Sequence, residues 1–239
     1  MIGSKLRHRG VNDKVVFNMN DKKDNFLDVG QIRITKPFGP SIAWVKIPPD
    51  LIKKLNNYID KVIEDKKKSN DLDWGKALVG DVTQEFRLEK NFSEEVGWTD
   101  FLTKGTANWI SHASNKKITK FEIISTWVIR QFKGEYNPIH WHGGHISGVG
   151  YLKVPKSLGD PVQKETKREN SNGHLELIHG TKMFLSNSVI KFKPEVGNFY
   201  FFPNYMMHTV YPFVGTDEER RSISFNAKID DDLYNVYEK

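Results

Sequence analysis

The chain has 239 residues and a formal net charge of +6; 12% of its residues are aromatic and none is cysteine. This length can bury a substantial core in one large or two small domains, and the lack of cysteine excludes disulfides and thiolate metal ligands. No apolar run reaches the length of a membrane span or of a signal-peptide core, so we expect a soluble, cytoplasmic protein. The lysines are scattered through polar segments without a nucleic-acid-binding motif, so we expect no nucleic-acid partner.

The first part of the chain predicts a polar arm, one strand and one helix. Residues 1–34 are polar and charged, which is typical of a loosely ordered terminus. Residues 42–47 predict a strand that ends at a pair of prolines. Asp50 is then placed to cap a helix that runs to about Glu64, in which apolar residues recur at helical spacing. The lysine-rich residues 66–70 predict an exposed exit from this helix.

The rest of the chain changes from helices to strands. Residues 71–95 predict a loop with a short extended piece, and a second helix is predicted from about Glu94 to Ala113. Residues 121–132 predict a long strand, and shorter strands are predicted near residues 147–154, 174–178, 188–193, 197–202, 207–212 and 221–229. Many short strands after a largely helical first half predict a mainly β sandwich or barrel buttressed by helices.

Histidines are concentrated in one short stretch. Three of the eight, His140, His142 and His145, lie within six residues of each other. His140 and His142 are two residues apart, so on a strand both side chains project from the same face. His208 follows in a strand-like segment rich in aromatic residues. Together His140, His142 and His208 offer three nitrogens to a transition metal, whereas each histidine alone would fit a local hydrogen bond equally well.

The segment Arg220-Arg221-Ser222-Ile223-Ser224-Phe225-Asn226 alternates between polar and apolar residues. On a strand this alternation places Arg220, Ser222, Ser224 and Asn226 on one face. A guanidinium with a hydroxyl two residues further on presents several donors suited to a carboxylate. In isolation the segment would fit an ordinary edge strand with exposed side chains. If it faced the same cavity as His208, it would hold a dicarboxylic acid whose other end binds the metal.

In this order, the segments resemble the iron(II)- and 2-oxoglutarate-dependent oxygenases, in particular a small bacterial and phage group related to prolyl hydroxylases. The resemblance covers residues 35–229 and rests on three motifs. They are Asn137-Pro138-x-His140-x-His142 leading into Ser147-Gly148-Val149-Gly150-Tyr151, then Gly197-x-x-x-x-Phe202-Pro203-x-x-x-x-His208, and last Arg220-x-Ser222-Ile223-Ser224-Phe225-Asn226.

The resemblance implies a double-stranded β-helix, the jelly-roll barrel of that superfamily, as a single domain over residues 35–239. Its helical support would span about 48–115 and its jelly-roll core about 118–230. If the gene is carried by a phage, the protein would act in the cytoplasm of the host.

The resemblance also implies an enzyme. Iron(II), 2-oxoglutarate and O2 would be used to hydroxylate a substrate, with release of succinate. His140 and His208 would bind the iron, while Arg220, assisted by Ser222, would pair with the far carboxylate of 2-oxoglutarate. By analogy the expected substrate is a peptidyl side chain such as proline. The sequence does not indicate an oligomeric state.

One position departs from the family pattern. Most members carry an aspartate or glutamate two residues after the first histidine, where this chain has His142, and no carboxylate lies between Glu135 and Asp160. The simplest account is a three-histidine site formed by His140, His142 and His208. Such a site is more positive by one charge, which would alter the redox behaviour of the iron. A shifted frame, with Gly144 in the carboxylate position, would instead resemble the halogenase variant.

Two alternatives keep the barrel but change the function. Cupins use a His-x-His pair, a later glutamate and a distal histidine, and Gly197 and His208 fit the spacing of their second motif. However, Ser147 stands near the place where the cupin glutamate belongs, and Arg220 with Ser222 has no cupin counterpart. The second alternative is a catalytically inactive barrel that binds a partner through its basic surface.

Overall fold

The computed structural model describes residues 39–160 and 170–235. The polar arm predicted for residues 1–34 lies outside the described residues, and the division of the chain into an arm and one domain stays a prediction. No helix in the described ranges combines the length and the apolar character that a membrane span requires.

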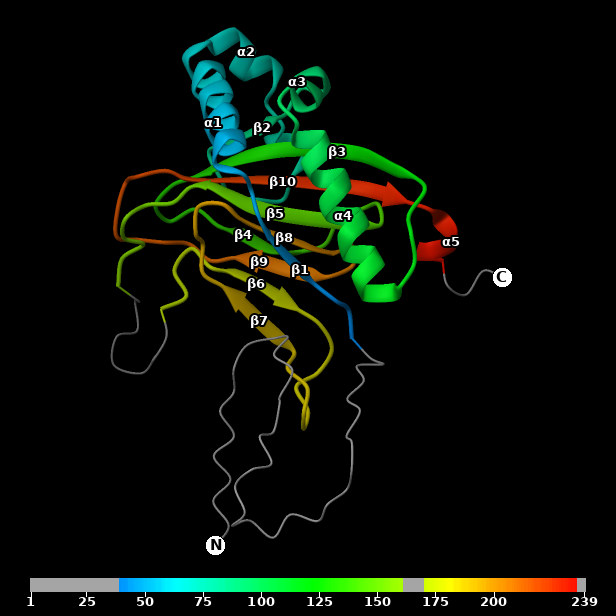
Figure 1. Ribbon diagram of the computed structural model, residues 1–239. Coiled ribbons are helices and arrows are strands. Elements are labelled where there is room, and N and C mark those ends of the chain that lie inside the picture. Colours follow the sequence, from blue (N-terminus) through cyan, green and yellow to red (C-terminus); the bar gives the residue numbers. More distant parts are fainter. Residues whose placement is uncertain (1–38, 161–169, 236–239) are drawn as a thin grey trace, which may run out of the picture. The chain divides into compact units, whose positions relative to one another are not determined.

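The helices come mainly from the first half of the described chain. They are α1 (Pro49–Glu64), α2 (Lys66–Asp71), α3 (Lys90–Glu95) and α4 (Trp98–Ser114), with a single 3-10 turn over Gly75–Ala77 and a short α5 (Asp231–Tyr234) near the end. Helices α1 and α4 lie on one side of the larger sheet (Figure 1). The prediction of helical support from this part of the chain is confirmed.

The strands form two antiparallel sheets. The larger has the order β1 (Ala43–Lys46), β8 (Asn198–Pro203), β5 (Ile146–Lys153), β10 (Arg220–Ile229), β3 (Phe121–Gln131) and β2 (Gln84–Arg87). The smaller has the order β4 (Asn137–His140), β9 (Met207–Val210), β6 (Leu175–Ile178) and β7 (Val189–Phe192). The chain crosses repeatedly from one sheet to the other, which is the winding of a double-stranded β-helix. The predicted jelly roll is confirmed, although hydrogen bonds do not close the two sheets into one barrel.

Local sequence explains where the helices begin and end. The structure corrects three of the predictions made for them. Helix α1 begins at Pro49, so Asp50 lies in its first turn and does not cap it. Residues 66–70 are not a simple exit: they form α2, because the Asp65 carboxylate accepts hydrogen bonds from two backbone N–H groups of its first turn. The single helix predicted from Glu94 to Ala113 is interrupted at Gly97, whose φ of 88° is outside the helical range.

The core between the helices and the larger sheet is apolar. Buried residues of α1 and α4, such as Leu55 and Leu102, belong to the same cluster as Val128 of β3 and Phe225 of β10. Glycine makes room for the rings: a Cβ on Gly148 would lie 2.6 Å from the Phe225 ring. This packing turns the opposite face of the larger sheet towards the smaller sheet, where the candidate site lies.

Candidate metal and cosubstrate site

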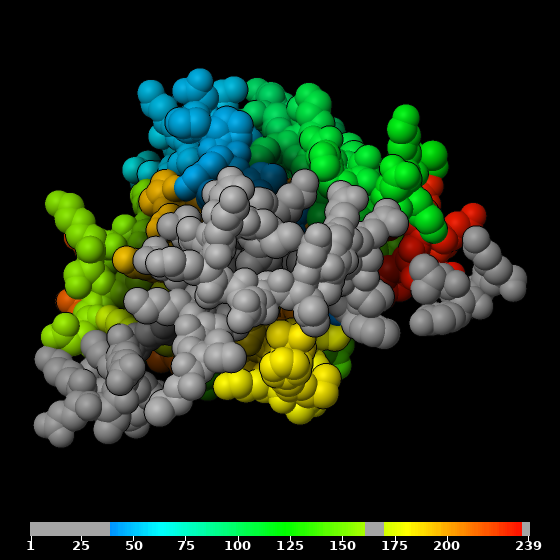
Figure 2. All heavy atoms as spheres, turned by 60° about the horizontal axis from the view of Figure 1, so that its bottom comes forward, coloured from blue at the N-terminus to red at the C-terminus, as the bar shows by residue number. Residues whose placement is uncertain are grey.

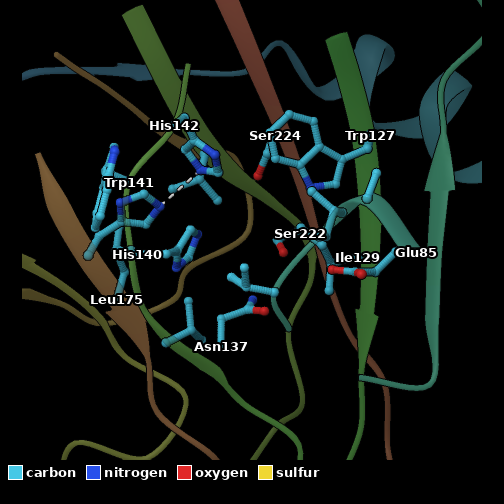
Figure 3. A pocket seen from close by; sticks show the side chains of 16 residues that line it. Glu85, Trp127, Ile129, Asn137, His140, Trp141, His142, Leu175, Ser222 and Ser224 are labelled. Carbon is cyan, nitrogen blue, oxygen red and sulfur yellow. Dashed lines mark hydrogen bonds between the residues drawn. The ribbon is translucent and has the colours of Figure 1, made fainter. Parts of the chain in front are cut away.

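Two neighbouring strands of the smaller sheet bring the distant histidines together. His140 of β4 is paired in register with His208 of β9. His142 follows directly after β4, and its backbone is held by Asn204, whose carbonyl accepts from the His142 N–H while its side-chain amide donates to the His142 carbonyl, both at 3.1 Å. One ring nitrogen from each of the three histidines lies within 4.8 Å of the others (Figure 3).

The ring nitrogens are oriented as metal ligands usually are. The Nδ1 atoms of His140 and His208 lie 2.7 and 2.9 Å from the carbonyls of Pro138 and Met206, so the hydrogen-bonding chemistry assigns the proton to Nδ1 and leaves Nε2 as the donor atom. The Nε2 atoms of His142 and His208 are 3.2 Å apart. This spacing fits two nitrogens at about 2 Å from one metal ion.

The triad is in the protonation state that binds metals. Burial, together with the neighbouring imidazoles, lowers the pKa of His208 to about 3 and that of His142 to about 4. Burial also lowers the pKa of His140. All three rings are therefore neutral at pH 7, with lone pairs available. A set of neutral nitrogens without thiolate suits iron(II) and other divalent first-row metals.

Gly144 and His145, the other candidate positions near these histidines, are not part of the triad. A Cβ on Gly144 would meet the Ile124 side chain and the backbone of Ala227 at 2.7 and 2.9 Å, so position 144 faces the larger sheet and does not stand in a ligand position. This geometry speaks against the shifted, halogenase-like frame. His145 stacks on Tyr234 with ring centroids 4.0 Å apart and has no part in the triad.

Arg220 lies buried inside the barrel. Strand β10 is central, between β3 and β5, so the idea of an edge strand with exposed side chains is wrong. The Arg220 Nη1 donates to Gln131 Oε1 at 2.6 Å, and its Cζ lies 4.8 Å from the centre of the Tyr151 ring. The Nε and Nη2 atoms of Arg220 and the hydroxyl of Tyr151 are buried without a hydrogen-bond partner among the described residues. Buried donors of this kind are expected to bind an anionic ligand.

A cavity of about 130 Å³ lies beside the triad and opens at one end of the two sheets. Ser222 and Ser224 line it from β10, as the alternation predicted, while Asn226 instead accepts a hydrogen bond from the Ser147 hydroxyl at 2.7 Å. The triad histidines share the cavity wall with apolar, aromatic and polar side chains, including Glu85, Trp127, Ile129, Asn137, Trp141 and Leu175 (Figure 3).

Sequence reasoning missed the carboxylate in this wall. Glu85 lies on β2, within the stretch for which only a loop and a short extended piece were predicted, and it is 3% exposed. Burial, reinforced by the nearby Asp73 and Glu135, raises the pKa of its carboxyl to about 8. A buried glutamate in the short run Gln84-Glu85-Phe86-Arg87 carries no local signal of its position, because only strand pairing turns it into the cavity.

These features define a class: a jelly-roll protein with a neutral histidine triad at one end and a buried arginine between the same two sheets. Residues 125–226 match a protein family described as "Putative 2OG-Fe(II) oxygenase". The match covers the strands that carry the triad and Arg220. It confirms the resemblance to the iron(II)- and 2-oxoglutarate-dependent oxygenases that was stated from the sequence.

Three solved bacterial structures have a similar fold. A Pseudomonas putida prolyl-4-hydroxylase is 14% identical, with a TM-score of 0.50 over 77% of this chain and 91% of that one. AviO1 from Streptomyces viridochromogenes is 13% identical, with a TM-score of 0.51 over 80% and 90% of the two chains. HygX from Streptomyces hygroscopicus, solved with nickel and 2-oxoglutarate, is 9% identical, with a TM-score of 0.50 over 79% and 82%. No protein with a curated description matches this chain by sequence.

Proposed function

We propose that this oxygenase holds iron(II) with His140, His142 and His208, binds 2-oxoglutarate with Arg220 and Ser222, and hydroxylates a peptidyl side chain. The observation that carries the proposal is the pair of unpartnered guanidinium nitrogens of Arg220 on the cavity face of the larger sheet. Ser222, two residues further along the same face, lines the cavity that the triad histidines also line. One dicarboxylic acid would satisfy both ends: its far carboxylate would bind Arg220 and its 2-oxo acid end would reach the triad.

In the overall reaction 2-oxoglutarate, O2 and a C–H bond give succinate, carbon dioxide and a C–OH group. Iron(II), when bound, supplies the activation of oxygen that drives the decarboxylation. The protein supplies the rest. The neutral histidines provide lone pairs, and Arg220, fixed by Gln131, orients the cosubstrate. Trp127 and Ile129 exclude water from the side of the cavity formed by β3.

His142 distinguishes this site from the usual two-histidine, one-carboxylate triad. Its ring lies 4.9 Å from the rings of both other histidines, which supports a role for His142 as the third ligand. An imidazole there leaves the iron with one negative charge fewer among its ligands. That difference disfavours the more oxidised states of the metal and favours slower turnover than in a site with a carboxylate.

A peptide substrate is supported by the surface around the cavity mouth. The loops after β4, β6 and β8 all lie at the end of the smaller sheet where His140 and His208 are paired. Trp141 lines the mouth and is 66% exposed, and Tyr205 is half exposed nearby. The β6–β7 hairpin, whose tip holds Phe184, protrudes on the side of the molecule away from α1 (Figure 2). Exposed apolar groups around a mouth of this kind suit an extended chain.

The proline side chain is the first candidate among peptidyl substrates. The solved prolyl-4-hydroxylase shares this fold, and the cavity offers an apolar wall that suits an uncharged ring. The fold shared with this prolyl-4-hydroxylase, at 14% identity, supports testing peptides that contain proline.

The test measures succinate produced by the iron(II)-loaded protein from 2-oxoglutarate, with and without a panel of proline-containing peptides. We expect slow turnover without peptide and faster turnover with the correct one. Calorimetry of 2-oxoglutarate binding to the metal-loaded protein is the second measurement. If metal is retained but 2-oxoglutarate does not bind, the cupin-like alternative replaces the proposal. If no metal is retained after purification, the inactive barrel replaces it.

A further inference from the structure

Glu85 is the buried acid that the proposed reaction does not use. Strand β2 is paired with β3 so that Glu85 lies opposite Ile129, and both side chains line the cavity. In Figure 3 the Glu85 carboxylate extends into the cavity on the side opposite His140. It therefore faces the space in which a substrate would lie, rather than the core beneath the helices.

In the part of the chain that the structure describes, the Glu85 carboxylate has no cationic partner. Its Oε2 is buried without a hydrogen-bond partner, and Glu85 takes part in no salt bridge among the described residues. Its charged neighbours, Asp73 from the loop before β2 and Glu135 from the turn after β3, are acids too. The ionised carboxylate would therefore be desolvated without compensation from these neighbours, and a cation bound beside it would stabilise its charged form.

The rest of the cavity wall also favours a cation at this place. The described residues that line it include no lysine and no arginine. Trp127 and Trp141 present aromatic rings to the same space, and aromatic faces attract ammonium and guanidinium groups. A neutral hydrogen-bonding role would explain a single unpaired oxygen, but it would not explain an acid that has two acidic neighbours and lies in a cavity wall without lysine or arginine.

We propose that Glu85 is a specificity-determining residue that binds a cationic nitrogen of the substrate, a primary ammonium or a guanidinium. This inference rests on the proposed function and names the chemistry of its substrate. If the hydroxylated side chain is proline, the cation belongs to a neighbouring residue or to an α-amino group. If it is lysine or arginine, the cation belongs to the hydroxylated residue itself.

The experiment uses n-butylammonium as the cationic probe and 1-butanol as its uncharged isostere. Both are titrated at about pH 9, where Glu85 is ionised, into full-length protein loaded with zinc(II) and 2-oxoglutarate. Binding is followed by NMR on the tryptophan indole signals. We expect the wild type to prefer the cation by at least about tenfold, the effect of one charge-assisted hydrogen bond. Glu85→Gln should remove the preference, while Glu85→Asp should keep part of it because the charge is retained.

Asp81→Asn is the matched control. Asp81 is exposed, lies four residues before Glu85 and does not line the cavity, so the same loss of charge there should leave both affinities unchanged. Equal affinity of the wild type for both probes, or an unchanged preference in Glu85→Gln, would overturn the inference. Succinate formation is measured separately on the iron-loaded protein. Turnover without cation preference refutes only the role of Glu85, whereas absence of turnover refutes the proposed function.

Discussion

Arg220 and Arg221 are adjacent on β10 and equally buried, at 1% and 0% exposure, yet their surroundings are opposite. Arg221 points to the helical side, where it donates to Glu219, to Asp60 at 2.7 Å and to the Asn56 side chain at 3.0 Å. Arg220 points to the cavity side, and among the described residues its guanidinium donates a hydrogen bond only to Gln131. One guanidinium is satisfied by the fold, and the other has nitrogens left to bind something else.

The same difference extends over the two faces of the larger sheet. The helical face is filled by apolar side chains from the strands and from α1 and α4. The cavity face keeps buried polar atoms without partners, among them Glu85 Oε2, Tyr151 Oη and two nitrogens of Arg220. Each such atom costs about 1–3 kcal/mol when it is left unpaired. The apolar packing on the helical face thus stabilises the fold. The unpaired polar atoms on the cavity face lower its stability but are available to bind a ligand.

The largest expected effect concerns the metal end of the cavity face. His208→Ala removes one of three ligand nitrogens and leaves a void between β4 and β9. We expect 2-oxoglutarate turnover to fall by more than about 100-fold, since even changes around metal ligands cost 10–100-fold. Succinate formation and metal content are the measurements. His112→Ala, on the exposed side of α4, is the control; turnover of His208→Ala near the wild-type rate would remove His208 from the site.

The second prediction tests the two arginines directly. Arg220→Leu should weaken 2-oxoglutarate binding by about 100-fold or more, because two charge-assisted hydrogen bonds to a carboxylate are lost. Arg221→Leu should instead destabilise the fold by about 1–3 kcal/mol, since Asp60 and Glu219 lose a buried partner and keep only Lys153 and Arg130. Calorimetry with 2-oxoglutarate and chemical denaturation separate the two effects. Similar losses of 2-oxoglutarate affinity in both variants would contradict the proposal that only the cavity face binds the cosubstrate.

The third prediction concerns pH and Glu85. The unfolded carboxyl ionises near pH 4.5, whereas the folded one stays protonated up to about pH 8. Between these values the folded state holds the extra proton, so the free energy of unfolding falls as pH rises. Glu85→Gln has no ionisable group at this position and does not lose stability in this way. The difference in Tm between Glu85→Gln and wild type should therefore increase from pH 5 to pH 8. The increase should correspond to a few kcal/mol, on the order of 1.4 kcal/mol per pKa unit. A pH-independent difference in Tm would contradict it.

A smaller effect is expected at His142. His142→Asp restores the carboxylate that most family members carry, so the site should still bind iron, and turnover should rise or stay within about tenfold, or 1.4 kcal/mol, of wild type. His142→Ala, which supplies no ligand, should bind the metal more weakly than either. Metal titration and succinate assays rank the three proteins. Equal metal affinity of wild type and His142→Ala would show that the imidazole is not a ligand.

The smallest effect is expected at the β6–β7 hairpin. Phe184 is 92% exposed, so Phe184→Ser should change the free energy of unfolding by less than about 0.5 kcal/mol. Turnover of 2-oxoglutarate without peptide should stay the same, because the tip does not line the cavity. If the tip helps to bind an extended substrate, KM for the peptide should rise. An unchanged KM would limit peptide contacts to the rim around Trp141.

Short-range sequence signals predicted several of the strands and helices and the residues of the candidate site. The strand-forming residues at 121–132 predicted β3. The alternation from Arg220 to Asn226 predicted the faces of β10, because side chains on a strand alternate between faces whatever the partner strand is. The spacing of His140, His142 and His208, read with Arg220 and Ser222, predicted a metal and cosubstrate site, since these residues lie in motifs a few positions long. The positions of α1 and of most of α4 followed from apolar periodicity, whereas the break at Gly97 and helices α2, α3 and α5 were missed.

The tertiary structure alone decided how the two faces of the larger sheet differ. Alternation places Arg220 and Arg221 on opposite faces, but only the packing of α1 against the larger sheet gives Arg221 its partner Asp60, 161 positions away. Glu85 enters the cavity because β2 is paired with β3, and Asn204 holds His142 because two loops meet at one end of the sheets. Contacts of this range depend on how the sheets and helices pack, and no local pattern of residues encodes them.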